Sequence, residues 1–307
     1  MKTLIGIVSY GNLDFLKLAL RGIRETVTKQ ADVAVVVAKP GDNPMVEYLH
    51  GLGGIHVIVN AYNKGFCGSL NDIYDHAFVN GDYDAVIIMG NDVIPYPKAI
   101  DRMIECADTK PHEWVAGSQY DAKSLIRDYP EARQFFVGPN QEYRDFESRP
   151  WDLHLASAIS VVPEIREAAK ADVQNLCLFK RSVFEKIGYF DANYAFNSFF
   201  GDNDYCRVAD LAGVDGCTLR GAGFFHFVSR TIHQGAKRDN DRFFRQNEAY
   251  YETKWGGLIG REKYTVPFNG GDVPLAEGLI ATPALKISSR ANEAAAIAFW
   301  SSDAARR

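Results

Sequence analysis

The chain opens on TLIGIVSYGN, residues 3–12, where a short apolar run from Leu4 to Val8 is closely followed by the Gly11-Asn12 turn signal. Such a run is typical of a strand that is buried on both faces. Apolar residues then recur at helical spacing from Leu16 to Val27, with Asn12 at the N-cap position. The opening of the chain therefore predicts a strand, a tight turn and a helix.

The same alternation continues along the first third of the chain. Apolar runs at residues 33–38, 55–59 and 85–89 predict three more strands. A helical pattern after the third run predicts a helix that begins at Ser69, with Asp72 completing an arrangement like a capping box. Strands that alternate with helices predict an α/β fold, a mostly parallel sheet flanked by helices that binds ligands at the carboxyl ends of its strands.

The signals in the rest of the chain are weaker. Further strands are expected at residues 114–117, 175–179 and 224–228, and helices at residues 181–187 and 204–211. Residues 110–172 predict a long loop or small helices, and the Ala-rich residues 292–300 predict an amphipathic helix.

Composition excludes several classes of protein. With 307 residues, 47% apolar and 24% charged, the chain is neither disordered nor a coiled coil, and its net charge of −5 excludes a global basic field for nucleic acid. Four basic residues between Lys237 and Arg245 are expected to be a solvated helix face. Five scattered cysteines without a C-x-x-C pair argue against a zinc ribbon or a disulfide framework and fit a reducing cytosol. We expect neither a signal peptide nor a membrane span, and hence a cytoplasmic location.

Common nucleotide and hydrolase motifs do not occur in the sequence. There is no G-x-G-x-x-G after the first apolar run, and no P-loop, G-x-S-x-G elbow or H-E-x-x-H. A ligand at the carboxyl edge of the sheet must therefore be held by other residues.

Four places carry candidate chemistry. The segment NKGFCGSLN, residues 63–71, combines glycines that permit close backbone approach with a helix start that attracts anions, although an ordinary turn has the same pattern. Asp92 follows a buried strand, where a carboxylate could hold a divalent cation against phosphates or simply belong to a turn. His226 is flanked by aromatic residues and suits either a core histidine or a metal ligand.

The fourth place contains Asp191, the closely spaced acids Asp202 and Asp204, and Arg207. One acid of the pair could be a general base, and the other could cap a helix, hold the base or contact the acceptor. Arg207 could form an ion pair with Asp204 three residues earlier on a helix.

In this order the motifs resemble the inverting GT-A glycosyltransferases of family 2, especially the rhamnosyltransferase-like branch, over roughly residues 3–230. The resemblance implies a nucleotide-sugar-binding half at residues 1–105 and an acceptor-binding and catalytic half at residues 106–255, together one GT-A domain. Residues 256–307 would be a C-terminal extension that covers the sheet or joins subunits.

The resemblance also implies roles for individual residues. Asp202 would be the general base, and Asp92 and His226 would hold Mn²⁺ or Mg²⁺ at the diphosphate. Asp191, Asp204 and Arg207 would support the base or contact the acceptor. The nucleotide sugar, UDP- or dTDP-linked, would contact a set of residues along the strand ends and the glycine-rich segment, namely Ser9, Tyr10, Asn63, Gly65, Asn71 and Asn91.

Two departures from the family pattern bear on function. Gly90 replaces the first acid of the D-x-D metal motif, and Gly201 replaces the acid before the base. They keep open the alternative of a catalytically inactive, sugar-nucleotide-binding scaffold. A sugar-1-phosphate nucleotidyltransferase is a further alternative, but it would carry a glycine-rich basic loop where this chain has Ser9 to Asn12. The acceptor could be a glycan, a small molecule or a modified nucleic acid, and the protein could be a homo-oligomer.

Overall fold

The computed structural model describes residues 1–120, 136–137, 142–143, 167–168, 175–194, 198–227 and 237–271. The strands of this part are β1 (Thr3–Ser9), β2 (Asp32–Val37), β3 (Ile55–Val59), β4 (Ala85–Gly90), β5 (Val93–Pro95), β6 (Trp114–Tyr120), β7 (Phe136–Val137), β8 (Glu142–Tyr143), β9 (Glu167–Ala168), β10 (Leu176–Lys180) and β11 (Gly216–His226). Its helices are α1 (Leu13–Thr26), α2 (Asn43–Leu52), α3 (Gly65–Tyr74), the π-helix η1 (Asp75–Val79), α4 (Ala99–Thr109), α7 (Arg181–Ile187), α8 (Gly201–Leu211), α9 (Lys237–Trp255) and the short η4 (Pro267–Gly270).

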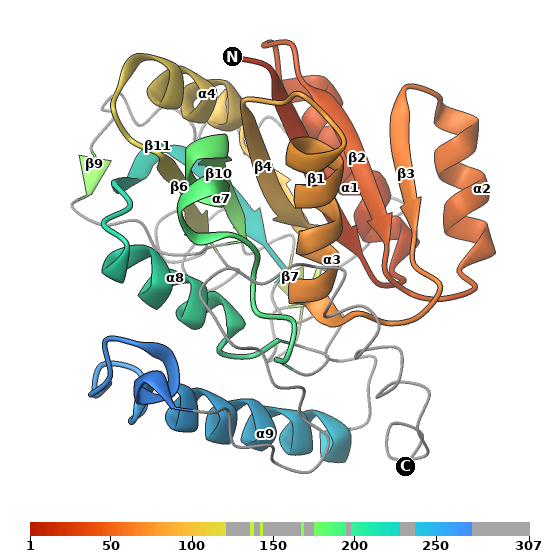
Figure 1. Ribbon diagram of the computed structural model, residues 1–307. Helices are drawn as coiled ribbons and strands as arrows, with labels where there is room; N and C mark the ends of the chain where they lie inside the picture. Colours follow the sequence, from red (N-terminus) through yellow and green to blue (C-terminus); the bar gives the residue numbers. More distant parts are fainter. Residues whose placement is uncertain are drawn as a thin grey trace.

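A mixed, mostly parallel sheet forms the centre of the structure (Figure 1). Its strand order is β3-β2-β1-β4-β10-β6-β11-β5, with β9 paired to β11. The first four strands in this order are parallel, β10 lies antiparallel between β4 and β6, and β11 is parallel to β6. The carboxyl ends of β1, β4, β6 and β11 therefore share one edge, where a doubly covered sheet binds its ligands.

Helices cover both faces of the sheet. One face packs against α3, α7 and α8 around an aromatic cluster that includes Tyr74, Phe179 and Tyr205. The other face packs against α1, α2 and α4 through aliphatic residues such as Leu20 and Met103. Strands β1 and β4 are buried along their whole length, which explains why their sequences are continuous apolar runs.

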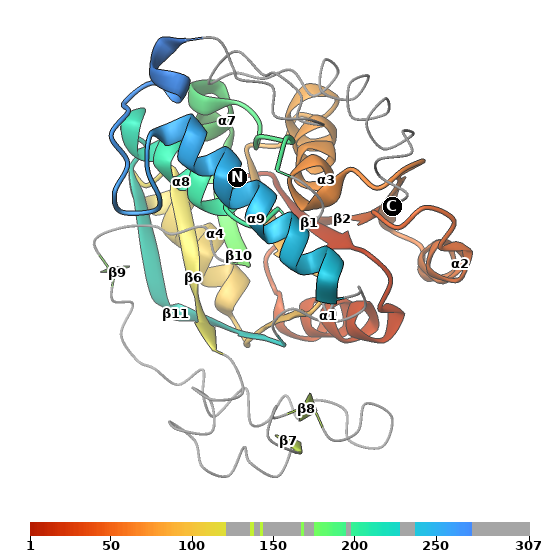
Figure 2. The same cartoon turned by 90° about the horizontal axis from the view of Figure 1, so that it is seen from below.

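Helix α9 crosses the molecule on the side of the shared carboxyl edge. It lies below α8 in Figure 1 and toward the viewer in Figure 2. Tyr250, Tyr251 and Trp255 near its end are buried in the same core cluster as α3, α7 and α8. A segment distant in sequence thus becomes part of the layer that contains the start of α8.

The expected strands are confirmed, with ends shifted by a few residues, and the run at residues 224–228 is the end of the longer β11. Two predicted helix starts are wrong. Helix α3 begins at Gly65, and Ser69 lies inside it, where its hydroxyl donates to the Gly65 carbonyl at 2.8 Å. Asp72 forms an ion pair with Lys64 at 2.8 Å, which replaces the expected capping box. Helix α8 begins at Gly201, so Asp202 and Asp204 both lie in its first turn.

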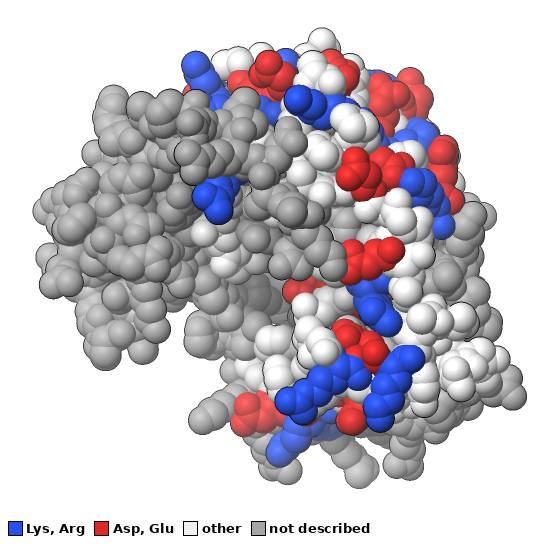
Figure 3. Space-filling view, turned by 90° about the vertical axis from the view of Figure 1, so that its left-hand side faces the viewer, with Lys and Arg blue, Asp and Glu red and all other residues white. Residues whose placement is uncertain are grey.

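Some elements of the structure were not predicted, and some predictions fall on residues outside the described ranges. Helices α2 and α4 were not predicted, and most of residues 110–172 and all of residues 292–300 lie outside the described residues. Of the expected C-terminal extension, residues 256–271 are described. In the described ranges, no helix has the length and hydropathy needed to cross a bilayer. Figure 3 shows Lys and Arg interspersed with Asp and Glu on the described part of one face.

Candidate active site

Asp92 and His226 meet at the carboxyl edge of the sheet. Asp92 lies in the turn between β4 and β5, and His226 ends β11, where it pairs with Val93 of β5. Their side chains are largely buried, and His226 Nε2 lies 3.5 Å from Asp92 Oδ1. The Asn175 amide lies 3.1 Å from His226 Nδ1 and orients the ring so that Nε2 faces Asp92.

This pair suits a divalent cation. Two ligands on one Mg²⁺ or Mn²⁺ lie about 3 Å apart at the usual metal–ligand distances, close to the separation of the Asp92 and His226 atoms. One carboxylate and one imidazole leave the remaining positions to diphosphate oxygens and water. Among the described residues there is no group of three or more His, Cys, Asp or Glu side chains that could hold a metal alone.

Gly90 lies beside this pair. A Cβ at Gly90 would be 3.0 Å from Asp92 Oδ1, so an acid at this position would bring a second carboxylate close to the first. Because glycine stands where the motif has its first acid, position 90 places no second negative charge beside Asp92.

Ser9 and Asn91 tie the turn after β1 to the end of β4. Both are buried, and the Asn91 amide donates to Ser9 Oγ at 2.8 Å and to the Gly11 carbonyl at 3.0 Å. The Ser9 hydroxyl donates to the same carbonyl at 3.1 Å. These contacts shape the wall of the site, next to the partly buried Tyr10. A direct contact of these three residues with a nucleotide stays a prediction.

The glycine-rich segment turns into α3 through an Asn63 side chain. Asn63 Oδ1 accepts from the Gly65 N–H at 2.9 Å, and Gly65 has a φ of 71°, a conformation that glycine adopts readily. Asn71 is buried further along α3 and bridges to the chain at Phe190, donating to its carbonyl and accepting from its N–H, both at 2.9 Å. Asn71 thus connects α3 to the segment before α8, and its predicted nucleotide contact remains untested.

The starts of α3 and α8 are packed directly against each other. A Cβ at Gly201 would lie 2.5 Å from Cys67 Sγ, and the Cys67 N–H donates to Ser198 Oγ at 3.1 Å. Burial raises the pKa of the Cys67 thiol, so the group stays neutral. Cys67 therefore occupies the space that a side chain at position 201 would need, which explains the glycine where the family pattern has an acid.

The two acids of α8 have opposite environments. Asp202 is exposed, and its Oδ1 accepts from the Asn203 N–H at 2.9 Å. Asp204 is 2% exposed and accepts from Trp255 Nε1 at 2.7 Å and from the Tyr194 hydroxyl at 3.1 Å. Only Asp202 can reach a substrate from its present position.

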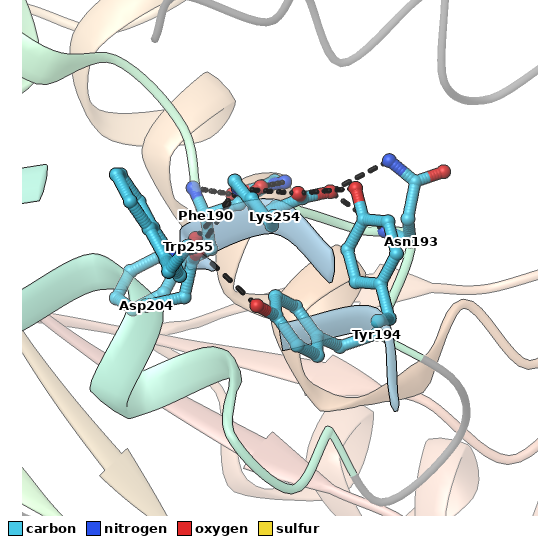
Figure 4. A network of polar contacts seen from close by, with 9 residues as sticks. Phe190, Asn193, Tyr194, Asp204, Lys254 and Trp255 are labelled. Atoms are coloured by element: carbon cyan, nitrogen blue, oxygen red, sulfur yellow. Dashed lines mark hydrogen bonds and ion pairs between the residues drawn. The ribbon is translucent and has the colours of Figure 1, made fainter. Parts of the chain in front are cut away.

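A buried ion-pair cluster connects α8 to α9 (Figure 4). It consists of Asp191, Asp204 and Lys254, and Lys254 Nζ lies 2.7 Å from Asp191 Oδ2 and 3.0 Å from Asp204 Oδ2. Burial raises the pKa of Asp191, but the Lys254 charge and hydrogen bonds outweigh it and hold that pKa below its usual value. The pKa of Asp204 is raised, mainly by burial. Burial lowers the pKa of Lys254, but the two carboxylates outweigh burial and raise it.

Arg207 does not form the predicted pair with Asp204. Its guanidinium donates to the Tyr264 carbonyl at 2.9 Å and lies 5.6 Å from the centre of a Trp255 ring. Among the described residues, the cation paired with Asp204 is Lys254, which sequence spacing could not indicate because it lies 50 residues away. Cys67 was missed for the same reason, since its contact at Gly201 comes from another helix.

Comparison with known proteins agrees with this architecture. The mannosyltransferase PcManGT from Pyrobaculum calidifontis, solved with GDP-Man and Mn²⁺, superposes with a TM-score of 0.50 and 14% identity, covering 81% of this chain and 69% of that one. Residues 1–349 of TarS from S. aureus, solved with UDP, give a TM-score of 0.51 and 11% identity, covering 82% of this chain and 72% of that one. These similarities show the GT-A fold. A search of curated proteins gave no match. The sequence model described as glycosyl transferase family 2 matches residues 4–188, more than half of the chain, and the protein belongs to that family.

Proposed function

We propose that the protein transfers a hexosyl or deoxyhexosyl group from a nucleoside diphosphate sugar to an acceptor hydroxyl with inversion, and that Asp202 is the general base. The observation that carries this proposal is the contrast between the two acids of α8. Asp204 is buried and paired with Lys254, whereas Asp202 is exposed on the first turn. The order of the motifs around Asp92 and Asp202 supports the rhamnosyltransferase-like branch within the family.

The reaction is an in-line displacement at the anomeric carbon of the donor. The acceptor oxygen forms a bond to that carbon as the bond to the diphosphate breaks, and the acceptor proton passes to a carboxylate oxygen of Asp202. A base within about 3 Å of the hydroxyl contributes roughly 10²- to 10⁴-fold in rate. Inversion follows because the acceptor attacks the face opposite the leaving diphosphate.

The leaving group needs positive charge on the other side of the site. A Mn²⁺ or Mg²⁺ ion held by Asp92 and His226 would neutralise charge on the diphosphate. The positive end of the α3 helix dipole, at Gly65, would add to this charge, since α3 follows the carboxyl end of β3. The GDP-Man and UDP in the similar structures support a nucleoside diphosphate sugar as donor, with UDP- and dTDP-sugars tested first.

An aromatic surface beside Asp202 is the proposed acceptor platform. Phe199 and Phe200 precede Asp202 in the sequence. Their ring centres lie 5.2 and 5.3 Å from the ring centre of Phe244, a residue of α9 that is 40% exposed. Aromatic faces of this kind favour the apolar face of a sugar ring. The platform therefore supports a carbohydrate-containing acceptor.

The test compares Asp202→Asn with Asp210→Asn, a control that removes an exposed acid at the far end of α8. Nucleotide release is measured from UDP-, dTDP- and GDP-sugars with and without Mn²⁺, and UDP affinity is measured by thermal shift. Asp202→Asn should keep UDP affinity and lose at least about 100-fold in turnover, as expected for a general base. Equal turnover in Asp202→Asn and the wild type would refute the assignment.

The alternative of an inactive sugar-nucleotide-binding protein is favoured by Gly90 and Gly201, which replace two acids of the family pattern. It predicts UDP binding without nucleotide release from any donor sugar, in the wild type as in Asp202→Asn.

A further inference from the structure

Helix α9 contacts the start of α8 through several side chains, among them the buried Lys254. Building on the proposed function, we propose that Lys254 is a positioning residue for Asp202: by holding Asp204 inside the protein, it fixes the rotation of α8 that turns Asp202 toward the substrate. The cluster of Asp191, Lys254 and Asp204 is thus part of the transfer machinery, although none of its members is aimed at the reacting atoms.

The geometry of the cluster restrains Asp204 strongly. Lys254 is 5% exposed, and its Nζ contacts both oxygens of Asp204, at 2.9 and 3.0 Å, as well as Asp191 at 2.7 Å. Tyr194 and Trp255 donate to the remaining acceptor positions of Asp204. A carboxylate with this many charge-assisted and neutral donors has one favourable orientation, which Figure 4 shows.

Several hydrogen bonds also restrain Asp191, on the other side of Lys254. Its Oδ1 accepts from the backbone N–H and the amide of Asn193, at 3.0 and 2.7 Å, and its Oδ2 accepts from the Tyr250 hydroxyl at 2.9 Å. Because Asp191 precedes α8, Tyr250 belongs to α9 and Asp204 belongs to α8, the cluster joins three segments at the candidate active site.

The orientation of Asp202 follows from that of Asp204. Two residues along a helix of 3.6 residues per turn are separated by about 200° around its axis, so an inward Asp204 requires an outward Asp202. The backbone before them is constrained as well, since Ser198 and Phe200 have φ values of 50° and 69°, unusual for residues with side chains. Such a conformation persists only where the surroundings hold it, and the Asp204 N–H donates to the Phe200 carbonyl at 2.8 Å.

The charges at the cluster make the lysine indispensable for this arrangement. One ammonium serves two buried carboxylates, so its removal leaves two like charges close together without their shared counterion. The carboxylates would then separate or draw in water, and α8 would turn. A displacement of about 1 Å at a catalytic group can reduce a rate about 100-fold.

The experiment uses Lys254→Met and a second variant, Lys254→Met/Asp191→Asn, which keeps the wild-type net charge of the cluster. The control is Lys186→Met, which breaks the Lys186–Glu113 pair at α7, away from the start of α8. Turnover and KM for the best donor sugar are measured by nucleotide release, well below the melting temperature of each variant. We expect the charge-matched variant to fold, to keep its donor KM within about threefold and to lose at least tenfold in kcat, with no such loss in the control.

A double-mutant cycle separates positioning from general support. If Lys254 acts through Asp202, the charge-matched substitutions should lower kcat at least tenfold in the wild type and by less than twofold in the Asp202→Asn background. Full additivity, an unchanged kcat, or loss of folding in both Lys254 variants would each overturn the positioning role. Failure of the proposed function looks different, because Asp202→Asn alone would then turn over like the wild type.

Discussion

A single methyl group at position 201 tests whether the starts of α3 and α8 are in direct contact. In Gly201→Ala the new Cβ would lie 2.5 Å from Cys67 Sγ, whereas ordinary van der Waals contact begins near 3.4 Å. Cys67 cannot move aside freely, because it is buried and its N–H donates to Ser198. Overpacking of this kind costs about 1–3 kcal/mol, and the better helix propensity of alanine returns at most about 1 kcal/mol.

We therefore expect Gly201→Ala to lower the free energy of unfolding by about 1–2 kcal/mol, which corresponds to a fall of a few degrees in Tm. Chemical and thermal unfolding of the single variant, of Cys67→Ala and of the double variant measure the effect. In the Cys67→Ala background the sulfur is gone, so the added methyl should be close to neutral. The control is Gly51→Ala on α2, where an added Cβ meets nothing within 4 Å.

The decisive quantity is the coupling free energy between positions 67 and 201, the difference between the effects of Gly201→Ala with and without Cys67. A loss for Gly201→Ala that is as large in the Cys67→Ala background as in the wild type would refute the direct contact. A loss of equal size in Gly51→Ala would show that the effect comes from replacing a helical glycine and not from Cys67.

Three further outcomes are expected. Asp92→Ala should remove the part of the UDP thermal shift that depends on Mn²⁺, and an unchanged shift would exclude Asp92 as a ligand. Phe244→Ala should raise the acceptor KM about 2- to 12-fold, the equivalent of one aromatic contact, with donor KM unchanged; an unchanged acceptor KM would remove Phe244 from the platform. Burial raises the pKa of Glu113, but its hydrogen bonds, led by Lys186, outweigh burial and hold the pKa below its usual value. A carboxyl with a lowered folded pKa stabilises the fold above its unfolded pKa and loses that contribution as pH falls through the folded pKa. Glu113→Gln should therefore lose less stability than the wild type in unfolding measurements between pH 5 and pH 3, and equal losses would contradict the assignment.

The centre of the sheet was predictable because strands β1 and β4 are buried on both faces. An apolar run such as residues 85–89 has few other uses in a chain of this composition, and the strand predicted at residues 55–59 matches β3. Helix α2 was not predicted because only Met45 and Leu49 on it are buried, so few apolar residues recur at helical spacing. Helix α4 carries a clear pattern from Ala99 to Ala107 and could have been found.

Helix starts were less predictable than helices. Ser69 has the residue type of an N-cap, yet the turn made by the Asn63 side chain and the positive φ of Gly65 begins α3 four residues earlier. Gly201 begins α8 because it fits against Cys67, a contact between residues far apart in sequence. Local propensity cannot report a helix start that a tertiary contact determines.

The candidate site, like the helix starts, could be predicted from the sequence only in part. Sequence reasoning selected Asp92 and His226, and the structure brings them to 3.5 Å because strand order places the ends of β4 and β11 at one edge. It also selected Asp204 and offered support of the base among its roles, but it did not find Lys254, which pairs with Asp204. The local sequence contains no sign of that lysine.

The two glycines at positions of family acids have physical explanations other than decay of an active site. Gly201 makes room for Cys67, and that contact packs the helix bearing Asp202 against the start of α3. Gly90 spares Asp92 a second carboxylate close to its Oδ1, and the pair of Asp92 and His226 leaves open ligand positions of the kind that diphosphate oxygens fill. The buried lysine holds Asp204 inside, and helix geometry then places Asp202, two residues away, on the exposed side in an active and in an inactive protein alike. Turnover by Asp202→Asn is therefore the measurement on which the proposal of a working base depends.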